Sequence, residues 1–212
     1  NKNLATEIKV REFSFSVIRH FPFASIDMQD VLINDVNDSA KKDTLIYANR
    51  LALLFNVTGI FNKDVTVRKI IFDKGNLNIR IDEDGEGNYK FWKTTNDTAK
   101  NGVIDLQKIL LKDVDITYND LKNSQHYNAF AHKAQLSGRF SSDEFTLTTS
   151  ANLFVSKLLV KNINYINQKE VEISSNLKVN TKTDLYKLEN SSVKIADVKF
   201  DIKGLTSGIV FY

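Results

Sequence analysis

Hydrophobic and polar positions alternate along much of this 212-residue chain, and one alternating phrase recurs. The phrase is an apolar-x-apolar pair, two polar residues, and a second apolar-x-apolar pair. Clear copies begin at Ile26, Val65 and Ile104, and weaker copies span 154–160 and 193–200. A fixed period predicts an array of supersecondary units that bury their apolar faces against one another. The closing apolar residues of the five copies are spaced by 39, 39, 49 and 40 positions: Ile33, Phe72, Leu111, Val160 and Phe200.

Alternation with a period of two is the side-chain pattern of a β-strand, yet the phrase jumps by three residues between its two apolar pairs. A β-bulge accommodates this jump, because two residues that share one pairing position leave the flanking apolar residues on the same face. A bulge at the same place in successive strands would curve the sheet. The predicted bulges are Gln29–Asp30, Arg68–Lys69, Gln107–Lys108 and Ala196–Asp197, with Arg11–Glu12 as a further candidate.

The whole pattern predicts an all-β fold, an elongated and strongly curved antiparallel sheet with few short helices. One proline and eight glycines occur among many Val, Ile, Leu, Phe and Tyr residues, a balance that favours long strands over many tight turns. We expect a single domain with units near 8–56, 57–101, 102–150 and 151–212. Both ends are interpreted as cuts in a longer protein, because residues 208–212 are strand-like and lack a terminator.

Composition narrows the classes of function. The net charge is +3, with 29 Lys and Arg interspersed among 26 Asp and Glu, which predicts a solvated surface and gives no sign of a nucleic-acid-binding stripe. The chain has no cysteine, so disulfides and cysteine metal sites are excluded. No apolar run reaches the roughly 18 residues of a membrane-spanning helix.

Candidate chemistry is sparse along the chain. No phosphate-binding loop, nucleophile elbow or kinase motif is present, so we expect no catalytic residue, no metal and no cofactor. The acidic run Asp82–Asn88 offers oxygen ligands that suit calcium, but Asp84-Gly85 between two alternating segments is typical of a hairpin turn. We therefore predict a hairpin here, with calcium binding as the alternative.

Several landmarks occur in a fixed order over residues 8–91. A strand-like run at 13–17 precedes a Phe-Pro pair, the first copy of the phrase, an Ala-x-x-Leu-x-Leu segment and a Gly-x-x-Asn hairpin. As a set, this order resembles the amino-terminal region of AsmA-family proteins. Beyond residue 103 the phrase itself and the strand-ending run Asp201–Gly204 are similar to the family. The landmarks are Phe21-Pro22, Asp30-Val31, Ala48–Leu53, Gly75–Asn78, Asp84-Gly85 and Asn88-Tyr89.

The resemblance implies a periplasmic protein of a Gram-negative bacterium, tethered to the inner membrane by an amino-terminal helix that this chain lacks. Members of that family are related to bridge-like lipid transfer proteins, and their taco-like sheet has an apolar interior implicated in moving phospholipid toward the outer membrane and in outer-membrane assembly. The implied partners are phospholipid or another acyl lipid, the membrane, and further envelope proteins. The chain is shorter than the usual family length, so a complete conduit is not implied.

The candidate lipid-binding residues are the apolar positions of the repeated phrase. Their side chains would line the interior, where acyl chains bind by burial of methylenes and head groups stay in water. They are Ile26, Met28, Val31, Ile33, Val65, Val67, Ile70, Phe72, Ile104, Leu106, Ile109, Leu111, Val155, Leu158, Val160, Ile195, Val198 and Phe200.

Two other functions remain open on the sequence. A structural or adhesive β-solenoid module would use the same repeat with a filled interior and no ligand. A carbohydrate-active enzyme would need two carboxylates within about 10 Å in a polar cleft. Acidic residues are frequent, but no pair stands out.

Overall fold

The computed structural model describes residues 8–35, 43–56, 67–89, 106–139, 143–180, 182–183 and 185–207. Within this part of the chain every regular element is a strand, and no helix occurs. This confirms the prediction of an all-β fold, but the few short helices of that prediction do not occur among these residues. The strands are β1 (Ile8–Lys9), β2 (Glu12–His20), β3 (Phe23–Asn34), β4 (Thr44–Asn56), β5 (Val67–Ile81), β6 (Lys108–Asp120), β7 (Gln125–Ser137), β8 (Glu144–Val160), β9 (Ile163–Asn180), β10 (Leu185–Ile195) and β11 (Val198–Ser207).

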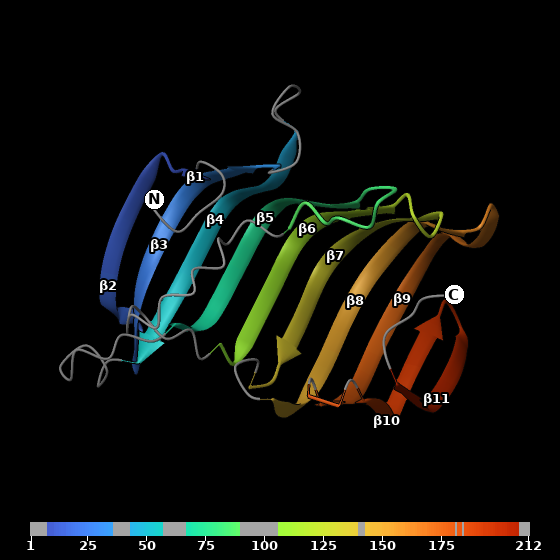
Figure 1. Cartoon of the computed structure of the whole chain (residues 1–212). Coiled ribbons are helices and arrows are strands. Elements are labelled where there is room, and N and C mark those ends of the chain that lie inside the picture. Colours follow the sequence, from blue (N-terminus) through green and yellow to red (C-terminus); the bar gives the residue numbers. More distant parts are fainter. Residues whose placement is uncertain are drawn as a thin grey trace.

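All eleven strands belong to one sheet, which follows the chain order from β3 to β11 (Figure 1). At one edge, β1 and β2 both pair with β3, one after the other, and at the opposite edge lies β11. In the described part of the chain these two edges do not pair with each other, so the sheet is not closed.

One strand pair departs from the predicted antiparallel sheet. Strands β5 and β6 run parallel, with Ile70 opposite Ile109 and Phe72 opposite Leu111. A parallel pair needs a crossover of about a dozen residues or more, and residues 82–107 provide that length. The pairing offset equals the 39-residue spacing between the second and third copies of the phrase, so these two copies lie side by side in register.

Strand alternation is broken at one place in the middle of each strand from β3 to β7. Two consecutive polar residues occur there, and Asp30, Lys74 and Asp113 have positive φ angles of 48°, 59° and 52°. The pairing register is the same on both sides of this polar break. Each neighbouring strand has two residues at this point where regular alternation would have one, so the extra residues match from strand to strand. The polar break consists of Gln29–Asp30, Asn49–Arg50, Asp73–Lys74, Lys112–Asp113 and His132–Lys133.

The predicted bulge positions are therefore only partly correct. Gln29–Asp30 is a break in alternation, and a register shift does occur opposite Arg68–Lys69. Gln107 precedes β6, and the break in β6 lies further along that strand. Ala196–Asp197 is not a bulge but the two-residue turn between β10 and β11, where Ile195 pairs with Val198.

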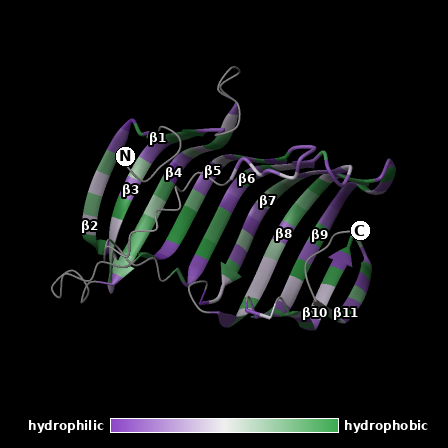
Figure 2. Ribbon diagram, in the orientation of Figure 1, coloured by the Kyte–Doolittle hydropathy of each residue, from purple (hydrophilic) through white to green (hydrophobic). Residues whose placement is uncertain are grey.

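Hydrophobic and polar residues alternate along the strands, as Figure 2 shows by colour. The main buried cluster includes Val31, Phe72, Val114 and Ala131, all at most 5 % exposed, and it spans β3 to β8. A smaller cluster of Ala52, Leu54 and Ile71 forms separately on β4 and β5. Because adjacent residues of a strand face opposite sides, Leu53 and Leu54 belong to different faces of the sheet.

Candidate functional site

One face of the sheet carries an unbroken row of apolar side chains across ten strands. Residues directly opposite each other in paired strands project to the same face, so the register defines this row without ambiguity. Every position is hydrophobic from β2 to β11, and we call it the first row. It consists of Phe13, Met28, Leu51, Phe72, Leu111, Ala134, Ala151, Ile173, Val193 and Phe200.

A second apolar row lies on the other side of the polar break. The break places two residues between the rows in β3 to β7, and the left-handed or otherwise irregular backbone there returns the chain to the same face. In β8 to β11 a single polar residue separates the rows, as in ordinary alternation. The second row consists of Val31, Ala48, Gly75, Val114, Ala131, Leu153, Val171, Ile195 and Val198.

Burial along the rows falls from the centre of the sheet to its edges. Phe72 is 5 % exposed, whereas Phe13 is 77 % and Phe200 is 48 % exposed at the two ends of the first row. Val114 in the second row is completely buried. The two rows therefore pack against one another in the centre and present apolar surface at the edges.

The structure brings most of the predicted lining residues to this face. Val31, Ile33, Phe72 and Val155 are buried in it, and Val198 and Phe200 are exposed at its edge. Val65 and Ile104 lie outside the described residues, and Leu106 is half-buried just before β6. The remaining predicted residues are half-buried: Ile26, Met28, Val67, Ile70, Ile109, Leu111, Leu158, Val160 and Ile195.

Several members of the face were not among the predicted lining residues. Ala131, Ala134 and Ala151 are at most 5 % exposed, but alanine is a weak hydrophobic signal in a sequence. Phe13 and Phe15 pair with Met28 and Ile26. Their alternation in the sequence predicts a strand, and only the register shows that it continues the apolar face.

The opposite face of β3 and β4 holds a buried ion pair. Asp27, 4 % exposed, accepts hydrogen bonds from Ser25 Oγ at 2.9 Å and from Arg50 Nε at 2.9 Å, and Arg19 lies 3.7 Å away. Burial by itself would raise the pKa of Asp27, but the hydrogen bonds from Arg50 and Ser25 and the charges of Arg50 and Arg19 outweigh it and lower the pKa. This arrangement stabilises a charge and offers no free acid or base.

The apolar face ends in polar aromatic residues at the β6–β7 turn. Tyr118 stacks on Tyr127 with ring centroids 5.1 Å apart, and its hydroxyl donates to Asp120 Oδ2 at 3.1 Å. Burial, followed by the charge and hydrogen bond of Asp120, raises the pKa of Tyr118 to about 12. Asp120 also accepts hydrogen bonds from the backbone and side chain of Asn123, both at 2.9 Å. The cluster therefore closes the turn.

The acidic run Asp82–Asn88 forms a tight turn with one antiparallel bridge, Ile81 to Gly87, and no second strand of the predicted hairpin occurs up to Tyr89, where this stretch of described residues ends. Gly85 has φ of 89° and its amide donates to the Asp82 carbonyl at 3.1 Å, while the Glu86 amide donates to Asp82 Oδ1 at 2.8 Å. Among the described residues no group of three His, Cys, Asp or Glu side chains is placed to hold a metal ion. Nor does any helix there have the length and hydrophobicity to span a membrane.

Together the fold and this face define an unclosed, single-sheet all-β protein with a continuous apolar surface. A comparison with models of known protein families finds no match, and a comparison with curated proteins finds none either. Any function must therefore be argued from the structure and from the sequence pattern.

Proposed function

We propose that this chain is a lipid-binding domain that holds acyl chains along the apolar face and performs no chemistry. The observation that carries the proposal is the first row, in which ten strands in succession place an apolar residue at the same level. Large apolar surfaces that extend to the edge of a protein are characteristic of ligand or membrane sites.

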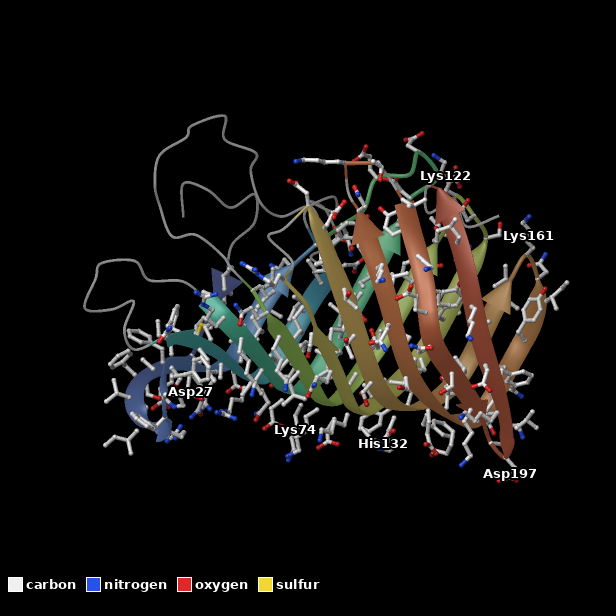
Figure 3. All side chains as sticks on the ribbon, turned by 90° about the horizontal axis from the view of Figure 1, so that it is seen from below. Asp27, Lys74, Lys122, His132, Lys161 and Asp197 are labelled. Carbon is white, nitrogen blue, oxygen red and sulfur yellow. The ribbon has the colours of Figure 1, made fainter. Side chains whose placement is uncertain are left out.

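In this proposal the sheet bends about the polar break, so that the two rows form the floor of an elongated groove. Matched breaks in five neighbouring strands would bend them all along one line. The view in Figure 3 supports this: mid-strand Lys74 and His132 lie at one side of the molecule, and Lys122 and Lys161 of the strand-end turns lie at the opposite side.

The lipid contacts are assigned to the half-buried residues above the floor. Ile26, Leu53, Ile70 and Ile109 pair in succession across β3 to β6 and form one such line, next to the first row. Each methylene buried against them contributes about 0.8 kcal/mol, so about ten methylenes would contribute roughly 8 kcal/mol before the cost of ordering the chain.

The resemblance to the AsmA family supports a more specific form of the proposal. The domain would belong to a periplasmic protein tethered to the inner membrane, would bind phospholipid in transit to the outer membrane, and would support outer-membrane biogenesis together with envelope partners.

The buried floor favours a second candidate function, a structural module with a filled core. Val31 and Val114 are at most 1 % exposed, so part of the face is protein core whatever the function. The two functions differ in the half-buried residues, which contact a ligand in the first and only other side chains in the second.

Lipid extraction and native mass spectrometry of detergent-free protein test the proposal. We expect co-purified phospholipid and uptake of a fluorescent phospholipid. Ile70→Asp and Ile109→Asp should each lower uptake at least tenfold while the β-type circular dichroism spectrum is retained. Ser150→Asp, at an exposed position of β8 whose alternation places it on the opposite face, is the matched control and should bind normally.

Two results would overturn the lipid proposal. One is wild-type protein that carries no phospholipid and takes up no fluorescent lipid. The other is unfolding of both Ile70→Asp and Ile109→Asp with Ser150→Asp intact, which would assign these isoleucines to a closed core and favour the structural module.

A further inference from the structure

The edge strand β2 and the turn after it expose an unusual concentration of large apolar side chains. Phe13, Phe15, Val17, Ile18 and Phe21 are 77 %, 61 %, 44 %, 84 % and 79 % exposed. No other segment of similar length in the described part of the chain has five such residues. Clustered exposure of this kind marks an interaction surface, whereas scattered apolar residues do not.

The patch has two parts with different geometry. Phe13 and Phe15 lie within the ladder, opposite Met28 and Ile26, and so extend the apolar face to the edge. Ile18 lies where the β2–β3 register is interrupted between Ser16 and His20, Phe21 lies in the turn between the two strands, and the Phe21 amide donates to the Ile18 carbonyl at 3.2 Å. The second part therefore projects from the end of the strand pair.

The charges around the patch are mainly positive. Strands β1 and β2, with the residues between them, carry Lys9, Arg11 and Arg19 against a single acidic residue, Glu12. The Arg11 guanidinium lies 2.6 Å from Asp30, and Arg19 lies 3.7 Å from Asp27, yet their side chains remain 64 % and 60 % exposed. Both arginines are therefore held in place and still accessible to an anionic surface.

We infer that the β2 edge and its turn dock on the surface of an anionic lipid bilayer. Ile18 and Phe21 would enter the boundary between head groups and acyl chains, and Arg11 and Arg19 would lie at the level of the phosphates. Apolar and aromatic residues beside exposed cations are the combination that binds such an interface.

A second copy of the chain fits the patch less well than a bilayer. Edge-to-edge pairing with another β2 would satisfy the backbone beside Phe13 and Phe15. It would leave Ile18 and Phe21 uncovered, because Ile18 lies in an interruption of the β2–β3 ladder and Phe21 lies in the turn after it. A bilayer covers the projecting turn and the edge together.

This inference extends the proposed function, because a membrane docked at β2 would lie at one end of the first row. Docking itself does not depend on lipid uptake. Ile109→Asp should lose uptake and keep bilayer docking. If wild-type protein docks and takes up no lipid, the proposed function fails and the docking surface stands.

Flotation with vesicles of phosphatidylglycerol and phosphatidylethanolamine tests the docking surface, with phosphatidylcholine vesicles for comparison. We expect binding to the anionic vesicles that weakens with salt and with phosphatidylcholine. The double variant Ile18→Ser/Phe21→Ser should reduce the bound fraction at least tenfold. The control Tyr165→Ser/Leu205→Ser removes two residues of similar exposure, 63 % and 65 %, on β9 and β11 and should bind as the wild type does.

Circular dichroism and size-exclusion chromatography establish that each variant is folded before flotation. Absence of binding to anionic vesicles overturns the inference, and so does an equal loss of binding in the two double variants. A wild-type dimer in solution that Ile18→Ser/Phe21→Ser converts to monomer, without vesicle binding, would instead assign the patch to a second copy. As a further readout, Arg19→Gln should reduce the salt dependence of docking.

Discussion

Gly75 occupies a position in the second row that no larger residue fits. A Cβ atom built at Gly75 would lie 2.0 Å from the backbone oxygen of Tyr47 and 2.8 Å from Cε2 of Phe72. The first contact is with the backbone of the neighbouring strand β4, which cannot rotate away. Gly75→Ala therefore must either separate β4 from β5 or displace the Phe72 ring, which covers the glycine in the wild type.

The cost can be estimated from the two contacts. Overpacking in a close-packed interior costs about 1–3 kcal/mol, and partial exposure of a buried aromatic ring adds about 1–2 kcal/mol. We expect Gly75→Ala to lower the free energy of unfolding by about 3 kcal/mol. Because a small domain has only about 5–15 kcal/mol in total, this loss would shift the urea midpoint clearly.

Gly204 supplies the matched control, since a Cβ atom there would meet nothing within 4 Å. Gly204→Ala should change the free energy of unfolding by less than about 1 kcal/mol, in the stabilising direction if the entropy of the unfolded chain dominates. Urea unfolding followed by circular dichroism measures both variants. A Gly75→Ala protein as stable as Gly204→Ala would refute the register and packing assigned to β4 and β5.

Three further predictions concern the titrating groups Asp27 and Tyr118 and the Asp27 partner Arg50. The lowered pKa of Asp27 means that its contribution to stability is present above its unfolded value, 3.8, and is lost as pH falls through the lower folded value. Asp27→Asn should therefore weaken the loss of stability at acid pH, measured by urea unfolding at a series of pH values. Arg50→Gln should cost about 3 kcal/mol at pH 7, because it removes the nearest cation and a hydrogen-bond donor from a buried carboxylate. The raised pKa of Tyr118, about 12 against an ordinary value of 10.0, gives stability that is present below pH 10 and lost toward pH 12. Tyr118→Phe should remove the most alkaline step from the tyrosinate absorbance titration, and an unchanged titration would contradict the assignment.

The amino-acid pattern predicts where the strands of the amino-terminal half lie in the sequence better than it predicts which strands pair with one another. Alternation in 26–33 identifies a strand with one apolar face, and the structure places Val31 and Ile33 in the buried cluster. The pattern cannot show which strand lies beside it, because pairing depends on the whole chain. For that reason the parallel pairing of β5 with β6 does not follow from the sequence pattern.

The position of the polar break shows a second limit of sequence reasoning. In β5 the two polar residues between the rows are Asp73 and Lys74, although Arg68 and Lys69 fit the repeated phrase equally well. Both pairs are polar, both are flanked by apolar residues, and only the register with β4 distinguishes them. A one-residue difference in register reverses every side chain of a strand, so the distinction has large structural consequences.

Small residues of the second row explain how one face could serve as both core and, in the proposed function, lipid-binding surface. Ala48, Gly75 and Ala131 lie beside the larger first-row residues, and Phe72 occupies the space above Gly75. The centre of the floor is thus filled by the protein itself, in keeping with the nearly complete burial of Ala48, Phe72 and Val114. In the proposed function an acyl chain would have no room there and would bind to the half-buried residues on either side, such as Ile109. The proposal therefore assigns filled core and lipid contact to different residues on one face, which is why substitutions at the isoleucines, and not at the floor, decide between the two functions.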